Sequence, residues 1–219
     1  MTDQYKTVRH EGRFELSDRG SRFIGLCRPI KTEEDALRLI SNARVLYPEA
    51  RHYVYAWRSN YLTKLQRFTD DGEPKGTAGR QVLDALVSQS IDRAAIVVVR
   101  YFGGVLLGTG GLTRAYSRSA RGAVEAAIPI QFIRCESFLL ETDYAVYHQL
   151  EGRLETAKFY LESPEYGARV RQIVGATSDR VDALTALIMD VSAGTALLRP
   201  EGERWIETRL EQEAADSDV

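Results

Sequence analysis

The chain has few residues of the kinds that form disulfide frameworks, metal sites or membrane spans. Only two cysteines and three histidines occur among 219 residues, and Cys27 and Cys135 stand far apart without a cysteine or histidine partner nearby. This excludes a disulfide framework and a zinc motif, and favours buried thiols. The longest apolar run, Ala94–Val99, is too short to cross a bilayer, and the N-terminal residues do not resemble a signal peptide. We therefore expect a cytoplasmic protein without membrane contact, metal or cofactor.

The overall composition is typical of a soluble folded protein, with 44% hydrophobic and 27% charged residues. The net charge of −2 conceals a difference between the two parts of the chain. Residues 1–130 contain 20 Lys and Arg against 14 Asp and Glu, a balance of +6, whereas residues 131–219 contain 9 against 17, a balance of −8. Such an asymmetry is compatible with a partner rich in phosphate that contacts the first part only.

The first part of the chain reads as a mixture of helices and strands that ends near Pro129. Thr32 opens a Thr-x-x-Asp capping pattern before a stripe of apolar residues at helical spacing, and Pro48 closes it. The apolar run that continues to Tyr101 predicts a central strand. The expected elements are a hairpin over 13–30, a helix over 32–47, strands over 52–57 and 61–68, a helix from Ala78, a strand over 94–101 and a helix over 112–127.

The second part repeats a simpler pattern, in the order βαββαβ. This order is typical of ferredoxin-like domains, in which two helices cover one face of an antiparallel sheet. The expected elements are a strand over 131–143, a helix over 145–158, strands over 159–164 and 168–175, a helix over 179–193 and a strand over 204–211. The sequence thus predicts an α+β protein with domains at 1–130 and 131–210, followed by an acidic tail over 211–219 that frays.

Two glycine-rich runs, over 70–80 and 101–116, hold eight of the seventeen glycines. Each precedes a predicted helix, so each places backbone N–H groups and positive φ angles where an anion can approach closely. The second run lacks the Gly-Lys-Ser/Thr ending of a Walker A loop and does not fit Gly-x-Gly-x-x-Gly, which disfavours a bound nucleotide. It predicts a nucleic-acid or anion site at Arg100, Tyr101, Gly103, Gly104, Gly108, Gly110, Gly111 and Arg114.

In this hypothesis the glycines present the backbone, and Arg100 and Arg114 add charge for phosphate oxygens. Tyr101 or Tyr116 stacks on a base if it is exposed. The alternative is structural: the glycines permit tight turns and close packing of a helix on the sheet, and the arginines are solvated.

The first glycine-rich run offers a different candidate site. Asp70, Asp71 and Glu73 crowd three carboxylates together, which suits acid–base chemistry or a hard cation. His52, on a predicted strand, could form a general-base pair with Asp70 or Asp71 in a hydrolase for small molecules. The alternatives are that the carboxylates cap the following helix and that the histidine is structural. A module that binds another protein without contacting RNA is a third possibility.

Two long motifs in the first part of the chain resemble the signature of the YigZ/IMPACT family. They cover residues 13–130 most strongly, and residues 143–144 are a weaker match in the second part. The motifs are Asp70-Asp71-Gly72-Glu73-Pro74 with Gly76-Thr77-Ala78-Gly79, and Val99-Arg100-Tyr101-Phe102-Gly103-Gly104 with Leu107-Gly108-Thr109-Gly110-Gly111-Leu112 and Arg114-Ala115-Tyr116.

The resemblance implies a first domain similar to domain IV of elongation factor G and to the second domain of a small-subunit ribosomal protein. It implies a second domain similar to the factor's ferredoxin-like domain V. We therefore expect a non-enzymatic, translation-associated protein that binds RNA or a ribosome-associated protein. The kinase-related regulatory role of eukaryotic relatives depends on a further protein-binding domain, and it is not carried over.

Overall fold

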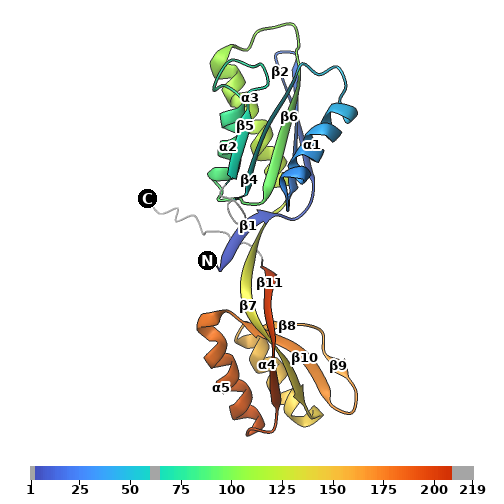
Figure 1. Cartoon of the computed structure of the whole chain (residues 1–219), viewed down its shortest axis with the longest axis vertical. Helices are drawn as coiled ribbons and strands as arrows, with labels where there is room; N and C mark the ends of the chain where they lie inside the picture. Colours follow the sequence, from blue (N-terminus) through green and yellow to red (C-terminus); the bar gives the residue numbers. More distant parts are fainter. Residues whose placement is uncertain (1–2, 60–64, 209–219) are drawn as a thin grey trace. The chain divides into compact units, whose positions relative to one another are not determined.

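The computed structural model describes residues 3–59 and 65–208 of the chain. Contacts within this part divide the protein into two compact units, Tyr5–Gln131 and Phe132–Thr208, the latter with residues 3 and 4. Both units combine helices with antiparallel strands, so the fold is a mixed α/β fold (Figure 1). No helix of the described part is long and apolar enough to cross a membrane. The predicted tail over 211–219 and residues 61–64 of a predicted strand lie outside the described residues.

The first unit is built on a five-stranded antiparallel sheet. Its elements, with the strand that precedes the sheet, are β1 (Gln4–Val8), β2 (Gly12–Asp18), β3 (Ser21–Pro29), α1 (Glu33–Leu46), β4 (His52–Ser59), β5 (Leu65–Thr69), α2 (Gly79–Val87), β6 (Ala94–Tyr101) and α3 (Gly108–Ala126). The strand order is β2-β3-β6-β4-β5, which places β6 at the centre. Because every residue of β6 from Ala94 to Arg100 is buried, both faces of the sheet must be covered.

Helices cover the two faces of this sheet, α1 on one side and α2 with α3 on the other (Figure 1). The alternation along a strand decides which side chain meets which helix. Val97 and Val99 of β6 pack with Leu39 of α1, whereas Ile96 and Val98 join the core shared with α2 and α3. This two-sided packing fixes the ends of β4, β6 and α3, from which the candidate site is built.

The second unit is built on another antiparallel sheet. Its elements are β7 (Pro129–Thr142, from Phe132 within this unit), α4 (Tyr144–Thr156), β8 (Tyr160–Leu161), β9 (Glu165–Tyr166), β10 (Val170–Ala176), α5 (Val181–Ser192) and β11 (Leu197–Thr208). β11 pairs with β7, β7 with β10, and β10 with β8. Leu150 and Leu154 of α4 and Leu184 and Ile188 of α5 form one core with the sheet, so both helices cover the same face.

The expected elements of the first unit match the structure except that β1 was not expected and that α3 begins earlier than predicted. The capping box that was expected at Thr32 is present, because its hydroxyl accepts from the Asp35 N–H and the Asp35 carboxylate accepts from the Thr32 N–H. The helix expected to start at Leu112 instead begins at Gly108. Helical geometry therefore extends into the glycine-rich run, so Gly110 and Gly111 lie in the first turn of α3 and not in a loop.

Two strands of the second unit also differ from expectation. The last strand begins at Leu197, not at residue 204, although Pro200 and Gly202 interrupt the expected pattern. β11 pairs with β7 alone, and an edge strand tolerates a proline because its outward N–H is not needed in the ladder. The strand expected over 159–164 shrinks to Tyr160–Leu161.

Both cysteines are buried free thiols, and burial raises the pKa of each. Because the thiolate is the reactive form, we expect Cys27 in a Cys135→Ser variant to react with an aromatic disulfide reagent at pH 8 at least about tenfold more slowly in the native protein than in denaturant. The rate of thiol release measured with and without urea tests this. Equal rates in the two conditions would show that Cys27 is accessible in the folded protein.

Candidate functional site

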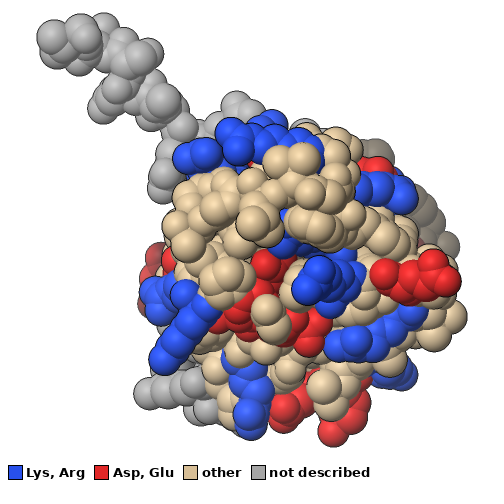
Figure 2. Space-filling model, turned by 90° about the horizontal axis from the view of Figure 1, so that it is seen from above, with Lys and Arg blue, Asp and Glu red and all other residues tan. Residues whose placement is uncertain are grey.

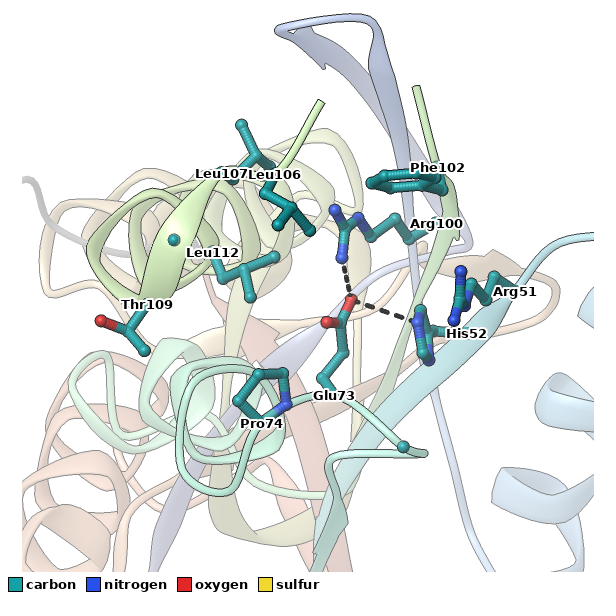
Figure 3. Close-up of a pocket in the computed structure, with 12 residues that line it drawn as sticks. Arg51, His52, Glu73, Pro74, Arg100, Phe102, Leu106, Leu107, Thr109 and Leu112 are labelled. Carbon is teal, nitrogen blue, oxygen red and sulfur yellow. Dashed lines mark hydrogen bonds and ion pairs between the residues drawn. The ribbon is translucent and has the colours of Figure 1, made fainter. Parts of the chain in front are cut away.

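One end of the first unit contains a pocket of about 340 Å³ (Figure 3). Segments far apart in the sequence contribute to it: the start of β4, the turn before α2, the end of β6 and the first turns of α3. Its lining residues are Arg51, His52, Gly72, Glu73, Pro74, Arg100, Phe102, Leu106, Leu107, Gly108, Thr109 and Leu112. The pocket therefore joins residues from both glycine-rich runs, which the sequence had suggested as separate candidates.

A buried ion pair forms the floor of the pocket. The Arg100 guanidinium donates to Glu73 Oε1 over 2.6 Å, and the Tyr116 hydroxyl donates to the same oxygen over 2.7 Å. Only 5% of the Arg100 side chain and 3% of the Glu73 side chain are exposed. Burial, together with the adjacent Glu73 carboxylate, raises the pKa of Tyr116, so its hydroxyl stays protonated and remains a donor.

One donor of the Arg100 guanidinium is buried without a partner. Its second terminal nitrogen reaches Ser21 Oγ at 3.4 Å, but its buried Nε has no hydrogen-bond partner among the described residues. A buried donor without a partner costs free energy, which the hydrogen bonds of the two terminal nitrogens offset only in part.

His52 lies beside this ion pair with its ring orientation fixed. Its Nδ1 is 2.8 Å from the backbone carbonyl oxygen of Asp71. Since a carbonyl oxygen can only accept, Nδ1 carries the proton, and Nε2 faces Glu73 Oε1 at 3.8 Å. Figure 3 shows the imidazole pointing toward the Glu73 carboxylate.

The carboxylates of Asp70 and Asp71 accept hydrogen bonds from backbone N–H groups and do not pair with His52. Asp70 Oδ1 accepts from the N–H groups of Ala78 and Gly79, so Asp70 caps the start of α2. Asp71 Oδ2 accepts from the Tyr53 N–H over 2.6 Å. The general-base pair of His52 with Asp70 or Asp71 is therefore absent, and the hydrolase alternative loses the contact on which it depended. Of the three predicted carboxylates, Glu73 is the one that meets His52.

The glycines of the second run have several different roles. The Gly103 N–H donates to Ser21 Oγ, so this amide is not available to a ligand. Gly104 and Gly108 adopt positive φ angles of 84° and 69°, which glycine tolerates best, at the two ends of the segment leading into α3. α3 has neither a side-chain cap nor an acidic residue in its first turn. Its first N–H groups therefore have no partner within the helix and lie next to the pocket.

The arginine and the two tyrosines that were also predicted to contact nucleic acid differ in how accessible their side chains are. Arg114 is exposed on α3. Tyr101 donates its hydroxyl to the Pro48 carbonyl oxygen, and Tyr116 is fully buried, so Tyr116 cannot stack on a base. Among the described residues, no group of three or more His, Cys, Asp or Glu side chains could hold a metal ion.

Eight of the twelve residues that line the pocket were not among the candidate site residues, and Arg51, Phe102 and Leu106 are three of them. The Arg51 guanidinium lies 5.8 Å from the centre of the Phe102 ring, and 81% of Leu106 is exposed. The sequence carried a signal for the last two, because Phe102 and Leu106 are apolar residues within a glycine-rich segment. Arg51 gave no such signal, since it joins the pocket only through the pairing of β4 with β6.

Comparison with known proteins places the chain in a family. The model of the Impact N-terminal domain matches residues 19–124. An IMPACT family member of Haemophilus influenzae is 32% identical over 188 residues, which are 85% of this chain and 91% of the relative. The chain belongs to the IMPACT family. The matched region of the family model contains every residue that lines the pocket.

Two further comparisons extend the IMPACT family likeness over most of the chain. The IMPACT family member YigZ of Escherichia coli is 32% identical over 180 residues, 81% of this chain and 88% of the relative. A crystal structure of a hypothetical protein superposes with a TM-score of 0.59 and 28% identity, covering 91% of this chain and 98% of that one. These relatives therefore share both units with this chain.

Proposed function

We propose that this IMPACT family protein is a cytoplasmic, non-enzymatic, translation-associated protein that binds RNA through its first unit. The observation that carries the proposal is a row of exposed arginines on α3, Arg114, Arg118 and Arg121. The net positive charge of residues 1–130 supports the proposal further.

The spacing of these arginines places them on one face of the helix. Steps of four and three residues return to the same side of an α-helix, and the row spans about 10 Å at 1.5 Å per residue. No ion pair or hydrogen bond involves the three guanidinium groups among the described residues. Unpaired guanidinium groups in a row can bind successive phosphates of one strand.

Charge elsewhere on the surface is mixed. Figure 2 shows a face on which groups of Lys and Arg surround a central group of Asp and Glu. The proposal therefore does not depend on a uniformly basic surface. The attraction comes from a local row of charges, which favours a short contact with single-stranded or structured RNA.

The arrangement of the second unit supports the finer fold assignment that we propose for it. The strand order β11-β7-β10-β8, with α4 and α5 on one face, is that expected of a ferredoxin-like domain similar to domain V of elongation factor G. For the first unit we propose similarity to domain IV of that factor. Both assignments agree with a protein that acts near the ribosome.

The salt dependence of RNA binding tests the role of the arginine row. For single strands, the slope of log K against log salt changes by about 0.7 for each phosphate contact. We expect the triple Arg114→Ala, Arg118→Ala, Arg121→Ala variant to show a slope shallower by about 2 when binding to a fluorescent single-stranded RNA is measured from 50 to 300 mM salt. Arg114→Ala alone should reduce the slope by about 0.7.

A matched control removes the same kind of charge from another helix. Arg38 is exposed on α1, next to Asp35, and Arg38→Ala should leave the slope unchanged. Equal slopes for the triple variant and the parent protein would contradict the proposal. Failure of the purified protein to bind any RNA, while it still co-purifies with ribosomes after nuclease treatment, would assign the contact to a ribosome-linked protein instead.

A further inference from the structure

The pocket contains hydrogen-bond acceptors that the arginine row does not use. Two of them, His52 Nε2 and Glu73 Oε2, have no hydrogen-bond partner among the described residues. We infer that the pocket receives the amino group of an unstacked base of the RNA that the first unit binds. The inference rests on the proposed function, because the base belongs to that RNA.

The tautomer of His52 makes Nε2 an acceptor. Because Nδ1 carries the proton that is donated to the Asp71 carbonyl oxygen, the neutral ring keeps a lone pair on Nε2. The nearest carboxylate oxygen, Glu73 Oε1, lies 3.8 Å away, too far for a hydrogen bond. The side chain of His52 is 11% exposed, and Nε2 is not fully buried, so a ligand can reach this atom.

The Glu73 carboxylate has one oxygen engaged and one free. Oε1 accepts from Arg100 and Tyr116, whereas no group among the described residues donates to Oε2. Figure 3 shows this second oxygen pointing away from Arg100, toward the side of the pocket that Thr109 and Leu112 line. An acceptor without a partner in a side chain that is 3% exposed costs free energy, which a donor on a ligand would recover.

The charges around the pocket favour a neutral donor. Arg100 balances the charge of Glu73, so the floor carries no net charge. Arg51 and the start of α3 at Thr109 lie on opposite sides of this floor, and the helix dipole makes the second of them positive as well (Figure 3). Both disfavour an ammonium group, and the lone pairs of the two free acceptors disfavour an anion. A neutral amino group remains.

One planar amino group can donate to both acceptors, because its two N–H bonds diverge. Oε2 is bonded to the same carbon as Oε1, which is 3.8 Å from His52 Nε2, so the two acceptors are only a few ångströms apart. Adenine, cytosine and guanine each carry a neutral amino group at the edge of the ring, whereas uracil presents carbonyl oxygens. The pocket should therefore distinguish uracil from the other bases.

Apolar side chains provide contacts for a flat ring. Phe102, Leu106, Leu107 and Leu112 line the pocket around Glu73 (Figure 3). Leu106 is 81% exposed and Phe102 is 40% exposed, so both have apolar surface that a base would cover. The volume of about 340 Å³ lies at the small end of the range for ligand pockets, which suits a single base.

The pocket and the arginine row share α3. Thr109 lines the pocket, and Arg114 is five residues further along the helix. This corresponds to about 7.5 Å along the helix axis. A base that leaves the stack next to the row has only this short distance to cross.

Base substitution in a short RNA tests the inference on the unchanged protein. The probes are fluorescent pentanucleotides of uridine with cytosine, adenine or unsubstituted purine at the central position, and all-uridine RNA as the reference. We expect cytosine and adenine to bind roughly tenfold more tightly than uracil, whose carbonyl oxygen would face the two acceptors. Unsubstituted purine lacks only the amino group, so it should bind roughly tenfold more weakly than adenine.

A spectroscopic signal locates the contact. The ¹⁵N resonance of His52 Nε2 should shift when the RNA with a central cytosine is added, and it should shift less with all-uridine RNA. A base preference without any change at His52 would place the readout elsewhere and overturn the inference.

Glu73→Gln should reverse the base preference. The amide oxygen has to accept from Arg100 and Tyr116, so the amide nitrogen takes the place of Oε2 and becomes a donor. This variant should bind all-uridine RNA at least as tightly as the RNA with a central cytosine. Glu15→Gln makes the same chemical change on β2, outside the pocket, and should keep the preference of the parent protein.

Thermal unfolding verifies that each variant is folded. If Glu73→Gln does not fold, the comparison of bases on the parent protein decides. Equal affinities for central cytosine and uracil, equal affinities for adenine and unsubstituted purine, or a folded Glu73→Gln variant with the parent's preference would each overturn the inference. Binding with the salt slope of the arginine row but without a base preference would overturn the pocket assignment alone, whereas absence of any RNA binding would overturn both proposals.

Discussion

Replacing Glu73 by alanine should lower the free energy of unfolding of the first unit by about 3–5 kcal/mol, the usual effect of removing one partner from a buried ion pair. The change leaves the guanidinium of Arg100 buried without a counter-charge. It also leaves the buried Tyr116 hydroxyl without an acceptor. Both groups are then buried away from water without a protein partner, and this uncompensated loss of hydration destabilises the folded state.

Urea denaturation measures this effect if the two units are distinguished. The chain has two tryptophans, and Trp57 is buried in the first unit, so a Trp205→Phe background makes the fluorescence report on that unit. Glu15, in a surface cluster with Arg13 and Arg22, provides the control, and Glu15→Ala should cost about 1 kcal/mol or less. A similarly small loss for Glu73→Ala would mean that the ion pair does not hold the floor of the pocket.

A double substitution distinguishes a structural pair from a functional one. Glu73→Leu with Arg100→Met removes both charges, and it should recover much of the stability that Glu73→Ala loses, because apolar residues often replace a buried ion pair without net cost. Such a recovery would show that the ion pair is not retained for stability, whereas a loss as large as that of Glu73→Ala would show that the charges themselves stabilise the unit.

Helices and strands could be predicted from the sequence where the local signals, such as caps and apolar runs, agree with one another. The capping box at Thr32 marks the start of α1 because both of its hydrogen bonds lie within four residues. The uninterrupted apolar run of β6 predicts a central strand, since only a strand covered on both faces buries it. The start of α3 was misplaced by four residues, because glycine disfavours a helix interior and its presence there had to be decided by packing.

The candidate site was less predictable because its geometry depends on how the chain turns. Asp70, Asp71 and Glu73 are nearly adjacent in sequence, yet each has a different environment. Asp71 and Gly72 both adopt positive φ angles, 43° and 84°, which direct the Asp70 carboxylate to α2, that of Asp71 to β4 and that of Glu73 into the core. No pattern of residue types predicts those three directions.

A substitution of Gly103 by alanine should also destabilise the first unit, by roughly 1–3 kcal/mol or more. A Cβ atom at this position would lie 1.9 Å from the carbonyl carbon of Gly20 and 2.2 Å from the backbone nitrogen of Ser21. These are backbone atoms of the turn between β2 and β3, so they cannot rotate away as a side chain would. The turn must shift, which would also disturb the hydrogen bond from the Gly103 N–H to Ser21 Oγ.

Gly110→Ala is the matched control, because it makes the same chemical change seven residues away with the opposite expected sign. A Cβ atom there meets only the end of the Arg114 side chain at 3.7 Å, an ordinary contact, and the residue is helical. Alanine should therefore stabilise the first turn of α3 by up to about 1 kcal/mol. Urea denaturation of both variants, followed by Trp57 fluorescence, compares the two. If both glycines tolerate alanine equally, packing does not require a glycine at position 103; opposite signs would establish that Gly103 is required by packing and Gly110 is not.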